Sequence, residues 1–176
     1  MLKNKQVAWS VTVVVMILSV FIGATGHYRR LQADAQAAFD EQIMPALNEA
    51  MVPAFNMQTV AANYLSAADI DRIGVATIVD NLRDSNGHGS NPRDIFDLYI
   101  DLNRAVWAIY DRLAAVDMSE QNRTFITNFH AAFNGWDVVL TVAGYNNIAA
   151  DFNAALQTNL GFIARPFVGV MPRFDN

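Results

Sequence analysis

The polar loop around His88 is the segment whose residue types come nearest to a metal site. It runs from Asp84 to Pro92 (DSNGHGSNP), and Asp84, Asn86 and His88 superficially follow the spacing of a calcium-binding loop. The twelfth position of such a loop needs a bidentate glutamate, and here it is Ile95. Glycine, asparagine, serine and proline are turn formers. We therefore interpret the segment as a solvated turn and expect no calcium there.

The other chemically capable side chains lie on predicted helices. His130 stands beside Phe129 and Phe133, and the sequence contains no Glu-x-x-His or His-x-x-x-His pair. Such pairs supply the ligands of di-iron and zinc sites in helical proteins. We therefore expect His130 to be a partly buried or edge histidine and not a metal ligand.

Three aspartates at helical spacing, Asp94, Asp97 and Asp101, could be taken for a carboxylate cluster, but Arg93 and Arg104 flank them. A charged solvent-facing helix surface is the simpler interpretation. The chain contains no cysteine, which excludes disulfides, thiolate metal sites, cysteine nucleophiles and cysteine-linked haem. No Ser-His-acid grouping or Gly-rich phosphate loop is present. We predict no catalytic residues, no cofactor and no metal.

Asn146 and Asn153 are the most informative polar residues. They are seven residues apart, so on a helix they project from almost the same side. An asparagine on a helix seam commonly fixes the register by hydrogen bonding, and we favour this structural role over ligand binding. Trp107 and Trp136 are interpreted as core fillers and not as a ligand cage.

The element that positions everything else is an apolar segment near the amino end. The chain is 53% hydrophobic and 16% charged, and residues 7–24 are almost continuously apolar. Twenty helical residues span about 30 Å, the thickness of a bilayer's hydrocarbon core. We predict a cytoplasmic stub and transmembrane anchor over residues 1–26, in contact with membrane lipid through residues 7–26. The alternative is a cleaved signal peptide with its cleavage site at residues 24–26 (ATG), although the apolar run exceeds the usual core of about 7–15 residues.

Orientation and charge limit the location and the partners. Lys3 and Lys5 precede the apolar segment, and Arg29 and Arg30 follow it. The positive-inside rule then predicts a cytoplasmic amino terminus, in a bacterial inner membrane crossed once, with the bulk of the chain periplasmic or extracellular. Residues 27–176 carry ten Arg, no Lys and seventeen Asp or Glu, a formal charge of −7. Phosphate backbones repel such a domain, so we expect no nucleic-acid partner.

Apolar residues three and four positions apart predict an all-α fold. Helices are expected over residues 28–65, from Ser66 to near Asp84, over residues 95–116 and over residues 125–156, the last preceded by a capping pair at Asp117 and Glu120. Pro45 and Pro53 should kink or break the first of these. Short connections favour antiparallel neighbours. The predicted fold is a single transmembrane helix that continues into an antiparallel bundle of about four long helices.

The predicted extracytoplasmic domain, residues 27–176, ends in an apolar tail. Glycines and prolines interrupt residues 158–176, so this tail is expected to be irregular. Since the helices alternate in direction, the last one should return toward the membrane beside Tyr28. The apolar tail residues can then cover the base of the bundle or meet the membrane interface.

Tyr145-Asn146 is followed seven residues later by Phe152-Asn153 and then by an apolar tail that ends in Pro172-Arg173-Phe174. This pattern resembles the signature of the LemA family, in which two Tyr-Asn pairs a heptad apart precede an apolar, proline-containing tail that ends in aromatics. The second pair here has phenylalanine in place of tyrosine, so the chain resembles a divergent member. In the amino half, Met51-Val52-Pro53 stands where the family has an apolar pair before proline. The residues that carry the resemblance, and that we select as structural or interaction candidates, are Tyr145, Asn146, Phe152, Asn153, Pro53, Phe162, Phe167, Pro172 and Phe174.

The resemblance implies one transmembrane helix carrying an extracytoplasmic bundle, with no established catalytic activity or cofactor. Some relatives are associated with magnetosome membranes. The expected function is a membrane-anchored helical scaffold or interaction protein that recognises a protein partner or a second copy of itself through a helix face, as in a coiled coil. The alternative is a sensor-type bundle that binds a ligand in a pocket between helices.

Overall fold

The computed structural model describes residues 2–85 and 90–175. The described chain is helical and contains no strand, so the prediction of an all-α bundle with a long apolar helix at its amino end is confirmed. The elements are α1 (Leu2–Ala38), the π-helix η1 (Phe39–Ile43), α2 (Met44–Ala61), α3 (Ala67–Ile73), α4 (Val75–Asp84), α5 (Pro92–Ala114), α6 (Glu120–Val142), α7 (Gly144–Ala155) and α8 (Asn159–Ala164).

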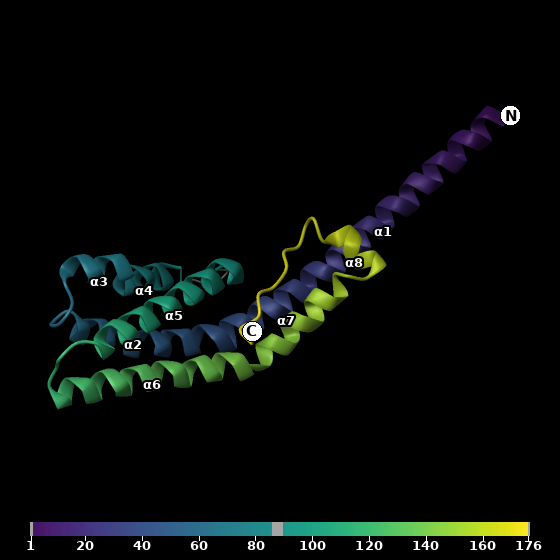
Figure 1. Cartoon of the computed structure of the whole chain (residues 1–176). Coiled ribbons are helices and arrows are strands. Elements are labelled where there is room, and N and C mark those ends of the chain that lie inside the picture. Colours follow the sequence, from purple (N-terminus) through teal and green to yellow (C-terminus); the bar gives the residue numbers. More distant parts are fainter. Residues whose placement is uncertain (1, 86–89, 176) are drawn as a thin grey trace.

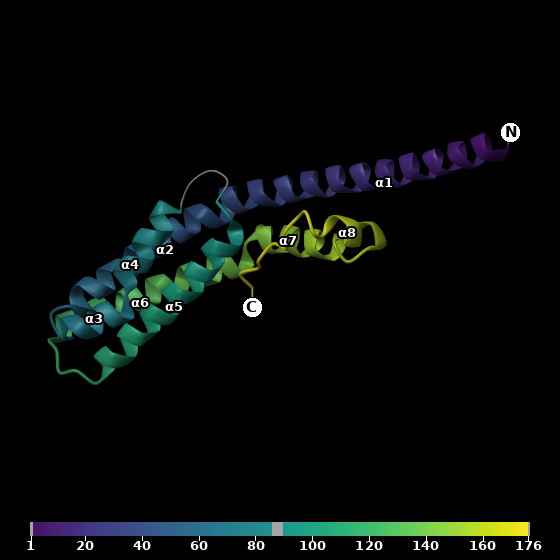
Figure 2. The ribbon, with the colours of Figure 1, turned by 90° about the horizontal axis from the view of Figure 1, so that it is seen from above.

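A single rod organises the molecule. Helices α1, η1 and α2 follow one another without a loop, and the amino-terminal half of α1 stands clear of everything else (Figures 1 and 2). At the other end α4, α5 and α6 pack around α2, while α7 and α8 lie along the later part of α1. Helices α6 and α7 run in the direction opposite to the rod (Figure 1). The bundle is therefore built around the continuation of the apolar helix.

The free half of α1 has the composition of a membrane span. Its most apolar window has a mean hydropathy of 2.4 and is only 6% buried by the rest of the chain. Trp9, Ile17 and Ile22 are 72%, 63% and 68% exposed. By length and composition, this is the one helix among the described residues that could cross a membrane.

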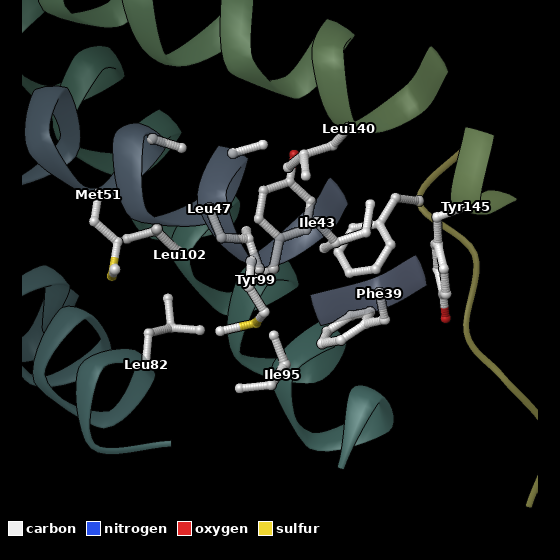
Figure 3. Close-up of a cluster of buried hydrophobic side chains, with 14 of the residues drawn as sticks. Phe39, Ile43, Leu47, Met51, Leu82, Ile95, Tyr99, Leu102, Leu140 and Tyr145 are labelled. Carbon is white, nitrogen blue, oxygen red and sulfur yellow. The ribbon is translucent and has the colours of Figure 1, made fainter. Parts of the chain in front are cut away.

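The core lies where the rod meets α4, α5 and α6 (Figure 3). Phe39 and Ile43 of η1 and Leu47 of α2 are at most 1% exposed, and Leu102 and Leu140 meet them from α5 and α6. Each such side chain contributes about 1.5–3 kcal/mol on burial. The packing of α2 by three helices therefore accounts for the stability of this end.

The prolines were expected to kink or break the rod, and the structure shows no break at either of them. Helix α2 continues through Pro53, whose side chain is buried. Pro45 stands in the first turn of α2, where a missing N–H is tolerated. The π-helical turn η1 comes immediately before it, with Met44 N–H bonding to Phe39 O. A local change of hydrogen-bond register thus replaces the expected break.

The prediction that the second helix starts at Ser66 is confirmed. Ser66 is the N-cap of α3, and its hydroxyl accepts a hydrogen bond from Asp69 N at 3.1 Å. Its predicted continuity is wrong, because Gly74 separates α3 from α4 in the left-handed conformation, with φ of 74°. Glycine adopts this conformation without steric cost. The Gln58 side chain then accepts from Ala76 N at 2.8 Å and satisfies one free donor at the start of α4.

The fourth predicted helix is also two helices. Ala143 is extended, with φ of −58° and ψ of 135°, and it separates α6 from α7. The N-cap of α6 is Ser119, whose hydroxyl accepts a hydrogen bond from Asn122 N at 3.3 Å. The predicted capping pair, Asp117 and Glu120, does not cap this helix. A serine at this position satisfies the same free N–H groups, so the prediction was two residues out of register.

Candidate functional site

Asn146 bridges the break between α6 and α7 and the chain's last residues. Its side chain is 3% exposed, and its Nδ2 donates to the carbonyls of Leu140 and Thr141, both at 2.8 Å. These carbonyls belong to the last turn of α6, where the carbonyls lack a full set of helical donors and Leu140 O accepts only a longer bond from Ala143 N, at 3.3 Å. Its Oδ1 accepts from Phe174 N at 2.8 Å. One amide therefore closes the end of α6 and holds the tail.

Asn153 holds the tail one step earlier. Its Nδ2 donates to Met171 O at 2.7 Å, and its Oδ1 accepts from Met171 N at 2.9 Å. The phenol of Tyr145 donates to Pro172 O at 2.9 Å, and burial raises the pKa of Tyr145. The side chains of α7 thus bind backbone groups of three tail residues. The two asparagines act on the tail backbone and not across a seam between two long helices.

Phe174 anchors the tail in the core. Its ring is 5% exposed and lies 5.0 Å from Phe96, 5.5 Å from Tyr99, 6.2 Å from Phe39 and 6.3 Å from Tyr145, measured between ring centroids. These rings belong to η1, α5 and α7. Phe174 therefore joins three elements of the bundle, and Figure 3 shows Phe39 and Tyr145 near each other at one end of the core.

The start of α7 is held by the rod. The Gln42 side chain in η1 accepts from Tyr145 N at 2.7 Å. A Cβ added at Gly144 would lie 3.2 Å from Gln42 Oε1, so glycine leaves room for this contact. Helix α7 has no side-chain cap of its own at Ala143. Gln42 therefore acts as its cap, from a position about a hundred residues earlier.

The tail is not wholly irregular, which corrects the prediction for residues 158–176. Helix α8 begins after Thr158, whose hydroxyl accepts from Gly161 N at 3.2 Å. A Cβ at Gly161 would lie 2.3 Å from Ala155 O and 2.7 Å from the Leu156 backbone. Only glycine allows this close approach. Local turn chemistry therefore permits a short helix that the broken apolar pattern did not predict.

The end of α7 lies beside Tyr28, as the alternation of helices predicts. The Tyr28 side chain is 5% exposed, and its hydroxyl donates to Ala155 O at 3.1 Å and bonds the Thr158 hydroxyl at 2.9 Å. Closer to the amino end, the Phe21 and Phe167 rings pack edge to face, 5.3 Å apart. The tail therefore reaches the last residues of the apolar segment of α1.

The candidate residues fall into three places. Most are brought together around α7, where Phe152 is also buried at 3% exposure. Pro53 lies further along the rod in α2. Phe162 and Phe167 are 73% and 51% exposed on the outside of the tail. Sequence reasoning missed Gln42, since an isolated glutamine on a long helix carries no motif.

His130 is more buried than predicted. It is 8% exposed and stacks on Tyr110 at 3.9 Å, with Trp107 edge-on at 4.4 Å, between ring centroids. Burial lowers the pKa of His130, and the charge of Asp111 opposes this. Its Nε2 is buried without a hydrogen-bond partner. Trp107 is 43% exposed, so its prediction as a core filler is wrong.

The aspartates of α5 form a solvent-facing charged surface, as predicted. Asp94, Asp97 and Asp101 are exposed, with Arg93 and Asp97 3.3 Å apart and Arg104 and Asp101 2.7 Å apart. The described residues contain no group of three His, Cys, Asp or Glu side chains placed to hold a metal. The calcium interpretation of the loop rests on Asn86 and His88, which lie outside the described residues.

A cleft of about 320 Å³ lies between the α3–α4 pair and α5. Three arginines and one aspartate line it together with isoleucines and alanines. Two of the arginines are already paired, Arg104 with Asp101 and Arg112 with Asp69, at 2.7 and 2.9 Å. The lining residues are Arg72, Ile73, Ile78, Asp101, Arg104, Ala105, Ala108 and Arg112.

Comparisons with known proteins identify no relative of this chain. No protein-family model, curated protein or solved structure matches the chain significantly. The geometry of the rod, α7 and the tail is therefore what indicates the function.

Proposed function

We propose that this chain is a membrane-anchored helical scaffold or interaction protein of the LemA type, without catalysis. The observation that carries the proposal is the continuity of α1, η1 and α2, by which an exposed apolar helix becomes the central helix of the bundle. A loop at this point would let the bundle tumble, whereas a continuous helix fixes its distance and direction from the membrane. Presenting a rigid surface at a defined height is the task of a scaffold.

The surface of α6 supports an interaction role. Val138 and Val142 lie four residues apart on one helix face and are 60% and 74% exposed, and the neighbouring Val139 is 43% exposed. Grouped apolar side chains on the outside of a bundle commonly mark a protein contact. We propose that this face of α6 binds a protein partner or a second copy of the chain.

Photocrosslinking in native membranes tests this function. A photoreactive residue at position 138 is expected to capture one defined product, either a second copy or a single partner. The control is the same residue at Thr124, an exposed polar position fourteen residues earlier on α6, which is expected to capture none. Identical products from both positions would contradict the interaction role.

The proposed location is a bacterial inner membrane, with the amino terminus in the cytoplasm and the bundle periplasmic or extracellular. The mature protein should then retain Trp9 and remain in membranes through carbonate extraction. A reporter at the carboxy end should be active only outside the cytoplasm. A mature amino terminus at His27 would instead make the protein a secreted one, and a cytoplasmically active reporter would reverse the orientation.

A sensor is the second candidate, because three arginines line the cleft between the α3–α4 pair and α5. A small carboxylate could bind Arg72 while its apolar part meets Ile73 and Ile78. Since Arg104 and Arg112 already pair with aspartates, we rank the scaffold first. A rise in melting temperature with small dicarboxylates, lost in Arg72→Gln, would favour the sensor.

A further inference from the structure

Helix α8 and the tail cover one side of α1 at the end of its apolar segment, near Phe21 and Ala24. Helix α8 packs against α1, where Ala24 is only 8% exposed. Phe167 contacts Phe21, and the Tyr28 hydroxyl bonds residues at the end of α7. The tail therefore extends past Tyr28 toward the amino end of α1 (Figure 1).

The position of Phe21 sets the depth of this contact. Phe21 lies five residues before residue 26, the end of the predicted span, which is roughly 7–8 Å along a helix. Amphipathic elements at a membrane interface bury their apolar side about 5–10 Å into the boundary between headgroups and acyl chains. If α1 spans the bilayer, Phe167 therefore lies within that boundary.

The tail presents apolar side chains outward as well as inward. Val168, Met171 and Ala164 are buried against the helices. The outward side consists of large apolar residues that are more than half exposed. These are Leu160, Phe162, Phe167 and Val170, which are 53%, 73%, 51% and 53% exposed.

The part of the molecule that contains the apolar segment of α1 and the tail lacks the acidic residues that are frequent elsewhere in the chain. Residues 7–33 and 152–174 contain no Asp or Glu, although the chain as a whole has seventeen. They carry Arg29, Arg30 and Arg165 at this end instead, whereas Arg173, beside the buried Phe174, is paired with Asp175. Arginines flanking an apolar surface favour anionic headgroups, and their stems bury beside the apolar groups.

We propose that Leu160, Phe162, Phe167 and Val170 form a membrane collar, which inserts into the headgroup and acyl boundary of the leaflet from which the bundle emerges. The occupant of this apolar surface is the lipid bilayer, because the surface is continuous with the predicted span and is flanked by arginines. The inference rests on the proposed anchoring of α1. A second contact beside the span fixes the tilt and rotation of the rod, which a single helix leaves free.

The chain has no cysteine, so single cysteines can carry a fluorophore in the full-length protein. Position 162 reports the collar, position 14 reports the span, and position 142 is the control. Phe162 and Val142 are matched, with 73% and 74% exposure, and Val14 is 54% exposed. Substitution at these exposed sites leaves the packed core unchanged. Val142 lies at the end of α6, three residues before Tyr145, whose N–H bonds Gln42, and therefore on the side of that contact away from the predicted span.

The labelled proteins are reconstituted in vesicles of phosphatidylcholine and phosphatidylglycerol, with bromine atoms on the upper acyl carbons as quencher. We expect strong quenching at residues 14 and 162, with residue 162 quenched at least half as much as residue 14, and none at residue 142. Quenching at residue 14 with none at residue 162 overturns the collar and leaves the anchor standing. Failure of the protein to float with the vesicles overturns the anchor and the collar together.

Discussion

The side-chain amide of Asn153 pairs with the backbone of Met171 through two hydrogen bonds, of 2.7 and 2.9 Å. This pairing uses both the donor and the acceptor of the amide, as a neighbouring peptide group would. Helix α7 thereby binds a tail segment that has no regular structure at that point. The pair links two parts of the sequence eighteen residues apart and explains how an apolar tail acquires a fixed path.

Replacing Asn153 with alanine removes both bonds and leaves the Met171 N–H and carbonyl without these partners. Each lost bond costs about 0.5–1.5 kcal/mol, so we expect the free energy of unfolding to fall by about 1–3 kcal/mol. Chemical denaturation of the full chain, followed by circular dichroism, measures the loss. The control is Asn147→Ala on the exposed face of the same helix, which should leave stability nearly unchanged.

Phe174→Ala is expected to destabilise the bundle by about 3–5 kcal/mol, the usual cost of removing a buried aromatic ring. Phe174 is 5% exposed among four other rings, whereas Phe162, in the same tail, is 73% exposed. Phe162→Ala should therefore cost almost nothing in detergent. Equal melting temperatures for the two variants would mean that the tail does not stabilise the bundle.

Much of the fold follows from the pattern of apolar residues. The three- and four-residue spacing predicts the helices, the uncharged segment predicts the exposed half of α1, and the alternation of helices places the end of α7 beside Tyr28. The Ser66 cap was also readable, because the side chain and the N–H that it accepts from are local. Such features depend on nearest neighbours along the chain.

The helix breaks at Gly74 and Ala143 were not predictable in the same way. The apolar spacing passes through both positions, and the break at Ala143 is stabilised by Gln42, which is distant in sequence. The course of the tail likewise depends on Asn146, Asn153 and a ring cluster contributed by three elements. The resemblance singled out α7 and the tail, but it did not indicate that these asparagines bind the tail backbone.

Two glycines of the carboxy-terminal half should respond in opposite directions to alanine. Gly161→Ala places a Cβ within 2.3 Å of Ala155 O, so α8 must shift and the melting temperature should fall. Gly135, inside α6, has nothing within 4 Å of its added Cβ. Gly135→Ala should raise stability by about 0.5–1 kcal/mol through helix propensity. A stabilising Gly161→Ala would show that α8 does not approach Ala155 this closely.

His130 should make stability depend on pH in the mildly acidic range. Burial lowers its pKa below the ordinary value of 6.5, so as the pH falls through 6.5 the unfolded chain takes up a proton before the folded chain does. The stability associated with neutral His130 is complete above pH 6.5 and is lost as the pH falls toward the folded pKa.

His130→Phe keeps the stacking on Tyr110 and removes the Nε2 that lacks a partner. We expect this variant to match or exceed the parent in stability at about pH 7.5 and to lose less on acidification to about pH 5. The change in melting temperature between the two pH values is compared for the parent and the variant. Both proteins have the same carboxylates, so the effect of protonating these groups cancels in the comparison. An identical loss in parent and variant would show that His130 titrates alike in the folded and unfolded chain, and its burial between Trp107 and Tyr110 would then have no effect on its proton.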